Sequence, residues 1–148
     1  MGVLRVEGFA CYTTSQDADL TESARQERMH PSLTTVQRID ELERLIAESD
    51  NRPLLLFKHS RSCGISAEAL DELIEHLNAA RLNVSAHDPR YAVVTVQTHR
   101  DVSNAVAARL GIRHETPQAI IVRRGKAVWS ASHFRVNAES IQKALSAS

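Results

Sequence analysis

An α/β domain with a central mixed sheet between two layers of helices is the fold class that this sequence predicts. Short apolar runs alternate with helical patterns through the middle of the chain, which is typical of parallel strands joined by helices. The pattern then changes to two apolar runs joined through Arg124-Gly125, which is typical of a tight hairpin turn. A last helical pattern follows. The predicted order is therefore β-α-β-α-β-α-β-β-α, a three-layer sandwich.

The strands are predicted from short apolar runs, and two of them, Pro53–Phe57 and Tyr91–Val96, are continuous as expected for strands buried on both faces. The helices are predicted from apolar residues that recur every three or four positions. Gly111 is a natural helix end, and Asn137 is a typical N-cap. The predicted strands span 33–36, 53–57, 91–96, 118–122 and 127–129, and the predicted helices span 39 to about 49, 65–82, 102–110 and 137 to about 145.

Composition limits the domain count and the partners. The 148 residues suit one domain, and 18 Lys and Arg against 18 Asp and Glu give no field for nucleic acid or an anionic membrane. Residues 1–32 are polar with little apolar period, so we expect a flexible or loosely packed extension before a domain of residues 33–148. The two cysteines, Cys11 and Cys63, are too few for a disulfide scaffold and fit a soluble, cytoplasmic protein. We interpret Cys11 as an incidental exposed thiol.

Cys63 stands where an apolar run ends and a helical pattern begins. A helix N-terminus carries partial positive charge and free N–H groups, which stabilise the thiolate, the reactive form of cysteine. The cations Lys58, His59 and Arg61 precede it and act in the same direction, although strand alternation points Lys58 and His59 to opposite faces. We therefore interpret Cys63 as a reactive thiol rather than a buried structural one.

Ser66 stands three residues after Cys63, where two-thiol chemistry would need a second cysteine. Its hydroxyl is available either to donate to the sulfur or to bond the backbone, and both interpretations stay open. His114 and His133 have no cysteine or carboxylate at metal-ligand spacing, so we expect no metal site and interpret both as solvated or hydrogen-bonded loop residues.

The predicted element order and the position of Cys63 are those of the thioredoxin fold. Thr116-Pro117 comes immediately before the strand 118–122, and a proline suits the leading edge of a strand because it cannot donate to the ladder. Proteins that share this fold place a cis-proline here, beside the reactive sulfur. By resemblance we predict a cis Thr116–Pro117 bond and a thiol ligand bound along Thr116.

A longer string of separated blocks resembles the monothiol bacilliredoxin (YtxJ-like) family over roughly Leu33 to Leu145. The family usually has proline directly after the cysteine, where this chain has Gly64, which adds an N–H and leaves the turn less rigid. The blocks are Phe57-Lys58-His59-Ser60, Cys63-x-Ile65-Ser66, Val102-Ser103-Asn104, Gly111-Ile112-Arg113-His114-Glu115-Thr116-Pro117-Gln118-Ala119 and Gly125-Lys126-x-Val128-Trp129-x-Ala131-Ser132-His133.

The resemblance implies a bacterial monothiol thiol–disulfide oxidoreductase that removes bacillithiol, a low-molecular-weight thiol, from protein mixed disulfides. It implies no required cofactor, bacillithiol or a similar thiol as co-substrate, S-thiolated client proteins as partners, and a monomer. The implied catalytic residues are Cys63, Ser66 and Lys58, and the implied thiol-ligand-binding residues are Thr116, Pro117, Gly64 and His59.

Two other functions stay open. Cys63-Gly64-Ile65-Ser66 also resembles the Cys-Gly-Phe-Ser site of monothiol glutaredoxins, which bridge an iron–sulfur cluster between two subunits with an external thiol. The downstream Gly-Gly-Asp-type thiol-binding signature of that family is absent. The third interpretation is a redox-inert adaptor with a thioredoxin-like fold, in which Cys63 would react as an ordinary thiol.

Overall fold

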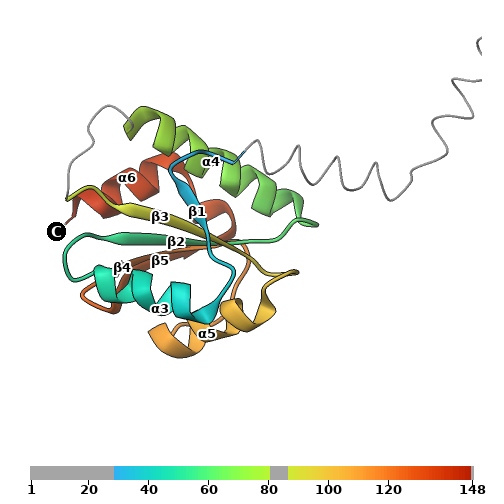
Figure 1. Cartoon of the computed structure of the whole chain (residues 1–148). Coiled ribbons are helices and arrows are strands. Elements are labelled where there is room, and N and C mark those ends of the chain that lie inside the picture. Colours follow the sequence, from blue (N-terminus) through green and yellow to red (C-terminus); the bar gives the residue numbers. More distant parts are fainter. Residues whose placement is uncertain (1–28, 81–86, 148) are drawn as a thin grey trace, which may run out of the picture. The chain divides into compact units, whose positions relative to one another are not determined.

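A computed structural model of the chain describes residues 29–80 and 87–147, and the predicted element order is confirmed in it (Figure 1). One short 3-10 helix, η1, was not predicted. The elements are β1 (Leu33–Thr35), α3 (Ile39–Glu48), β2 (Leu54–His59), α4 (Gly64–Ala80), β3 (Arg90–Thr95), α5 (Arg100–Leu110), β4 (Gln118–Arg123), β5 (Lys126–Ser132), η1 (His133–Arg135) and α6 (Ala138–Ser146).

The strands form one mixed sheet in the order β1-β3-β2-β4-β5. The first three are parallel, and β4 pairs antiparallel with both β2 and β5. In the register of the central strands, Phe57 lies opposite Val93 on one side and Ala119 on the other. The helices α4 and α6 cover one face, and α3 and α5 cover the other, so the predicted three-layer mixed-sheet sandwich is confirmed (Figure 1).

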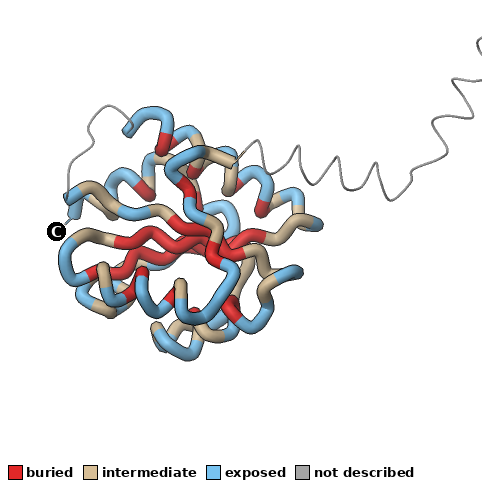
Figure 2. Tube along the Cα trace, in the orientation of Figure 1, coloured by how far each residue is buried: buried red, intermediate tan, exposed pale blue. Residues whose placement is uncertain are grey.

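β2 lies at the centre of the core because both of its neighbours and both helical layers cover it. All six of its residues are buried, as Figure 2 shows for the middle of the sheet. Leu54 and Leu56 belong to the apolar cluster that contains Leu42 and Val106 of the α3–α5 layer. Burying each such side chain contributes about 1.5–3 kcal/mol. Residues of β2 alternate in direction, which places Phe57 and His59 on the α4 face, where their rings stack at 6.0 Å between centroids.

The turns and caps confirm the local predictions. Arg124 and Gly125 have φ values of 54° and 73°, the left-handed pair that a tight two-residue hairpin turn requires. Gly111 ends α5 with φ 64°. Asn137 caps α6 by accepting from the Ser140 amide at 2.8 Å, while the Ser140 hydroxyl accepts from the Asn137 amide.

Most element ends differ from the predictions by one to three residues, and the largest difference is in β5, which spans Lys126–Ser132 rather than 127–129. β2 runs on to His59, past the predicted end at Phe57, because Lys58 and His59 continue the ladder with β3 despite their polar side chains. α4 begins at Gly64 rather than Ile65, and Leu82 lies outside the described residues. Residues 1–28, Cys11 included, also lie outside them, so the boundary at residue 32 stays a prediction. Within the described ranges, helices long and apolar enough to cross a membrane are absent.

Candidate active site

Cys63 lies at the N-terminus of α4. Its carbonyl accepts the first hydrogen bond of the helix from the Ala67 amide at 3.1 Å, which makes Cys63 the N-cap residue. The side chain is half-buried, and the thiol is free. The following turn of this 17-residue helix carries unsatisfied N–H groups and the positive end of the helix dipole. The thiol at this position is half-buried and therefore accessible to a partner.

Ser66 ties the start of α4 to the end of β2. Its hydroxyl is fully buried, accepts a hydrogen bond from the Ser60 amide at 2.9 Å, and lies 2.8 Å from Nδ1 of His59. Ser66 therefore fixes both ends of the loop that carries Cys63. When the His59 proton is on Nε2, the single Ser66 hydrogen is directed to Nδ1 of His59. In that tautomer Ser66 positions the loop and does not donate to the sulfur.

Gln97, which follows β3, holds the same loop from the other side. Its Nε2 donates to the hydroxyls of Ser60 at 2.6 Å and Ser62 at 3.1 Å. Its Oε1 accepts from the Arg61 amide at 3.2 Å. Gln97 was not predicted, because it lies 36 positions from Arg61 and belongs to no motif. Only the pairing of β2 with β3 brings it to the loop.

The Thr116–Pro117 peptide bond is cis, as predicted. Antiparallel pairing of Lys58 with Gln118 places Pro117 at the edge of the sheet from which the Cys63 loop leaves β2. The Pro117 carbonyl accepts from the His133 amide at 3.1 Å, and the side-chain Nε2 of Gln118 donates to the Arg113 carbonyl at 3.1 Å. The loop before β4 is therefore held at both of its ends. This loop lies at the same end of the sheet as the loop that carries Cys63.

Lys58 and His59 lie on opposite faces of the sheet, as strand alternation predicts. His59 meets Ser66 of α4, whereas the ammonium of Lys58 lies 2.7 Å from Nδ1 of His114 beside α5. Lys58 is fully buried, and this burial lowers its pKa to about 8. Burial and the charges of Lys58 and Arg100 lower the pKa of His114. The structure therefore separates two predicted catalytic residues: Ser66 lies on the α4 side, together with the predicted ligand-binding residue His59, and Lys58 lies on the α5 side.

His114 is a hydrogen-bonded loop residue, which is one of the two states predicted for it. The ring is exposed, and besides Lys58 it lies 3.5 Å from the Ser103 hydroxyl and 3.4 Å from the Thr116 hydroxyl. Gly64, the residue after Cys63, is exposed at the first helical position, and a Cβ added to it would meet nothing within 4 Å. Among the residues described, no three His, Cys, Asp or Glu side chains gather as metal ligands.

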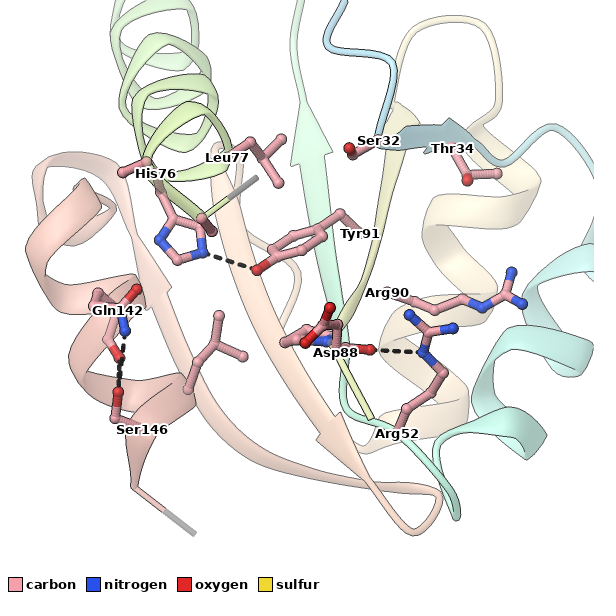
Figure 3. A pocket seen from close by; sticks show the side chains of 14 residues that line it. Ser32, Thr34, Arg52, His76, Leu77, Asp88, Arg90, Tyr91, Gln142 and Ser146 are labelled. Carbon is pink, nitrogen blue, oxygen red and sulfur yellow. Dashed lines mark hydrogen bonds between the residues drawn. The ribbon is translucent and has the colours of Figure 1, made fainter. Parts of the chain in front are cut away.

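A cavity of about 760 Å³ lies at the opposite end of the sheet, next to the C-terminal ends of α4 and α6 (Figure 3). There Nε2 of His76 lies 2.9 Å from the Tyr91 hydroxyl. Burial lowers the pKa of His76, and burial together with the charge of Asp88 raises the pKa of Tyr91 to about 12. This cavity is lined by none of the predicted site residues, so we place the candidate site at Cys63 and not here.

A half-buried thiol at a strand-to-helix junction and a cis-proline directly before β4, at the same end of a mixed five-stranded sheet, define a thiol oxidoreductase of the thioredoxin fold. Residues 34–141 match the family described as monothiol bacilliredoxin BrxC, and the chain belongs to this family.

Solved structures agree with this assignment. A candidate oxidoreductase with a thioredoxin fold is 31% identical with a TM-score of 0.66, over 76% of this chain and 93% of the other. Two more distant matches show the fold alone. Mitochondrial thioredoxin 3 of Saccharomyces cerevisiae is 16% identical with a TM-score of 0.58, over 78% of this chain and 94% of the other. A poplar thioredoxin h mutant is 18% identical with a TM-score of 0.60, over 78% and 81%.

Proposed function

We propose that this protein removes a low-molecular-weight thiol, bacillithiol, from protein mixed disulfides through Cys63 alone. The observation that carries the proposal is the position of Cys63 as N-cap of α4, combined with Ser66 at the place where a second cysteine would stand. Membership of the monothiol bacilliredoxin family supports the choice of small thiol. We propose Thr116 and Pro117 as the wall that receives this ligand, with His59 and Ser66 positioning the loop that carries Cys63.

The reaction consists of two exchanges. The Cys63 thiolate attacks the small-thiol sulfur of the mixed disulfide, so that a new disulfide joins Cys63 to the small thiol and the client sulfur leaves as a thiolate, which then takes up a proton. A second small-thiol thiolate attacks the adduct at its small-thiol sulfur. This step releases the small-thiol disulfide and restores Cys63. Electrons balance without a resident cofactor, because the second small thiol is the reductant.

Mass spectrometry after treatment with oxidised bacillithiol tests the first exchange. We expect one adduct per chain in Cys11→Ser, and none when Cys63→Ala is added to Cys11→Ser. An adduct that survives this double substitution, or a Cys11→Ser protein that forms none, contradicts the proposal. A client protein carrying bacillithiol should then lose it when the wild type and free bacillithiol are added together.

The proposal also includes the setting of the reaction. We propose that the protein acts as a monomer on S-thiolated clients in the cytoplasm of a bacterium that makes bacillithiol. Anaerobic purification tests this against the iron–sulfur carrier function. A colourless monomer is the expected result, and a coloured dimer whose absorption requires Cys63 and an added small thiol would replace this proposal with the carrier function.

A further inference from the structure

A buried charge lies behind the Thr116–Pro117 wall. Lys58 is fully buried in the central strand of the sheet, and its ammonium meets the exposed ring of His114 at 2.7 Å. Burying an ammonium is costly, and an apolar side chain of similar volume in its place is often more stable. The residue therefore does not serve to strengthen the core. Through His114, Lys58 is connected to the exposed loop before β4, at the end of the sheet where Cys63 lies.

The hydrogen bond between Lys58 and His114 can run in one direction only. An ammonium can only donate, so Nδ1 of His114 accepts from Lys58 and the ring proton lies on Nε2. Burial and the Lys58 charge 2.7 Å away both lower the pKa of His114, which favours the neutral ring. Nε2 lies 3.4 Å from the Thr116 hydroxyl, so its N–H points to that oxygen. The hydrogen of the Thr116 hydroxyl is then available to donate to a ligand.

Most of the charged side chains near Thr116 are positive, like Lys58. Arg100 of α5 adds a second positive charge near His114. The neighbouring residue, Glu115, is a carboxylate whose pKa is held below the ordinary value first by a hydrogen bond with Ser132 and then by the nearby side chains of His133, Arg113 and Arg135. The positive side chains near η1 therefore offset the negative charge of Glu115. A ligand bound along Thr116 would therefore accept a hydrogen bond from the Thr116 hydroxyl, which is linked through His114 to the buried Lys58 ammonium.

We propose that Lys58, His114 and Thr116 form a relay that recognises a carboxylate of the small thiol, so that Cys63 reacts fastest with small thiols that carry a carboxylate. This inference rests on the proposed function, in which Cys63 takes up a small thiol. Lys58 and His114 act as positioning residues in this relay, and Thr116 makes the contact. The relay therefore specifies the chemical class of the ligand, a small thiol that carries a carboxylate.

Three mixed disulfides that differ only in the charge of the tail test the relay. Pyridyl disulfides of mercaptopropionate, mercaptoethanol and mercaptoethylamine each transfer their aliphatic thiol to Cys63 and release pyridinethione, whose absorbance gives the rate. The intrinsic reactivity of Cys63 cancels in the ratio between the anionic and the cationic probe. We expect a ratio well above one for the wild type, and a fall of about fivefold or more in Lys58→Met.

The control variant is Lys126→Met, which removes the same charge from an exposed residue of the hairpin at the opposite end of β4. Its ratio should equal that of the wild type. His114→Asn provides a second test, because it keeps an acceptor near Lys58 and removes the donor to Thr116, and it alters an exposed loop residue in case Lys58→Met does not fold. We expect its ratio to fall as well.

The outcomes separate the two proposals. If the probes transfer to Cys63 but a folded Lys58→Met or His114→Asn keeps the wild-type ratio, the relay is wrong and the proposed function stands. If no probe transfers to Cys63 in the wild type, both are wrong. A fall of the ratio in these two variants, with Lys126→Met unchanged, supports the relay.

Discussion

The Ser66 hydroxyl lies 2.8 Å from Nδ1 of His59 and accepts a hydrogen bond from the Ser60 amide, so one buried oxygen joins the end of β2 to the start of α4. In Ser66→Ala both partners lose this oxygen in a buried or half-buried place, which costs about 1–3 kcal/mol. Urea unfolding measures the loss. Ser130→Ala, an exposed serine of β5, is the control and should change stability by less than about 0.5 kcal/mol. Equal effects of the two variants would show that the Ser66 oxygen does not hold the loop.

Gln97 should matter for reactivity more than for stability. Its side chain is exposed, so Gln97→Ala leaves no buried group unsatisfied and should change the free energy of unfolding by less than about 0.5 kcal/mol. It also removes one hydrogen bond from each of the three residues before Cys63, and we expect the rate constant for adduct formation to fall several-fold. The control is Gln142→Ala, an exposed glutamine of α6 that bonds Ser146. A Gln97→Ala rate equal to that of Gln142→Ala would argue against this role.

Gly64 is not required by its backbone or by its surroundings. A Cβ there meets nothing within 4 Å, and its φ lies outside the left-handed range. Gly64→Ala should therefore raise the free energy of unfolding by about 0.4–1 kcal/mol, since alanine restricts the unfolded chain. Gly111→Ala is the matched control: the space is equally open, but φ is +64°, so we expect a loss of about 1–2 kcal/mol. Thermal unfolding of both variants should give shifts of opposite sign.

Lys58 should cost stability near neutral pH. Its pKa is about 8 in the folded chain against 10.5 ordinarily, so between these values the folded state binds fewer protons than the unfolded state, and stability rises with pH. Below about pH 8 both states are protonated and the whole cost is present. Lys58→Met should thus be more stable than the wild type by about 1–3 kcal/mol at pH 7.

This gain should shrink as the pH rises from about 8 toward 10.5, where the wild type no longer buries a charge. Urea unfolding of both proteins across this range provides the difference. Tyr91, whose pKa is raised to about 12, affects both proteins alike and cancels. A gain that does not change with pH would show that the pKa of Lys58 is the same in the folded and the unfolded chain.

The sequence by itself determined the element order, the hairpin at Arg124-Gly125, the helix ends at Gly111 and Asn137, and the place of Cys63 before α4. These features depend on the period of apolar residues or on the conformational preference of one residue, and both are properties of contiguous chain. The opposite directions of Lys58 and His59 followed from strand alternation in the same way. The cis form of Thr116–Pro117 came from resemblance and was confirmed.

Only the tertiary structure decided which partners these side chains have. Lys58 and His114 are 56 residues apart, and Gln97 reaches Ser60 across 37 residues. Such contacts form where sheet pairing brings loops to one edge, and no local period encodes them. The same holds for Ser66, whose two interpretations differed only in where its hydroxyl finds a partner. The sequence alone therefore identified the reactive cysteine, whereas the packing of distant loops decided which residues hold the loop that carries it.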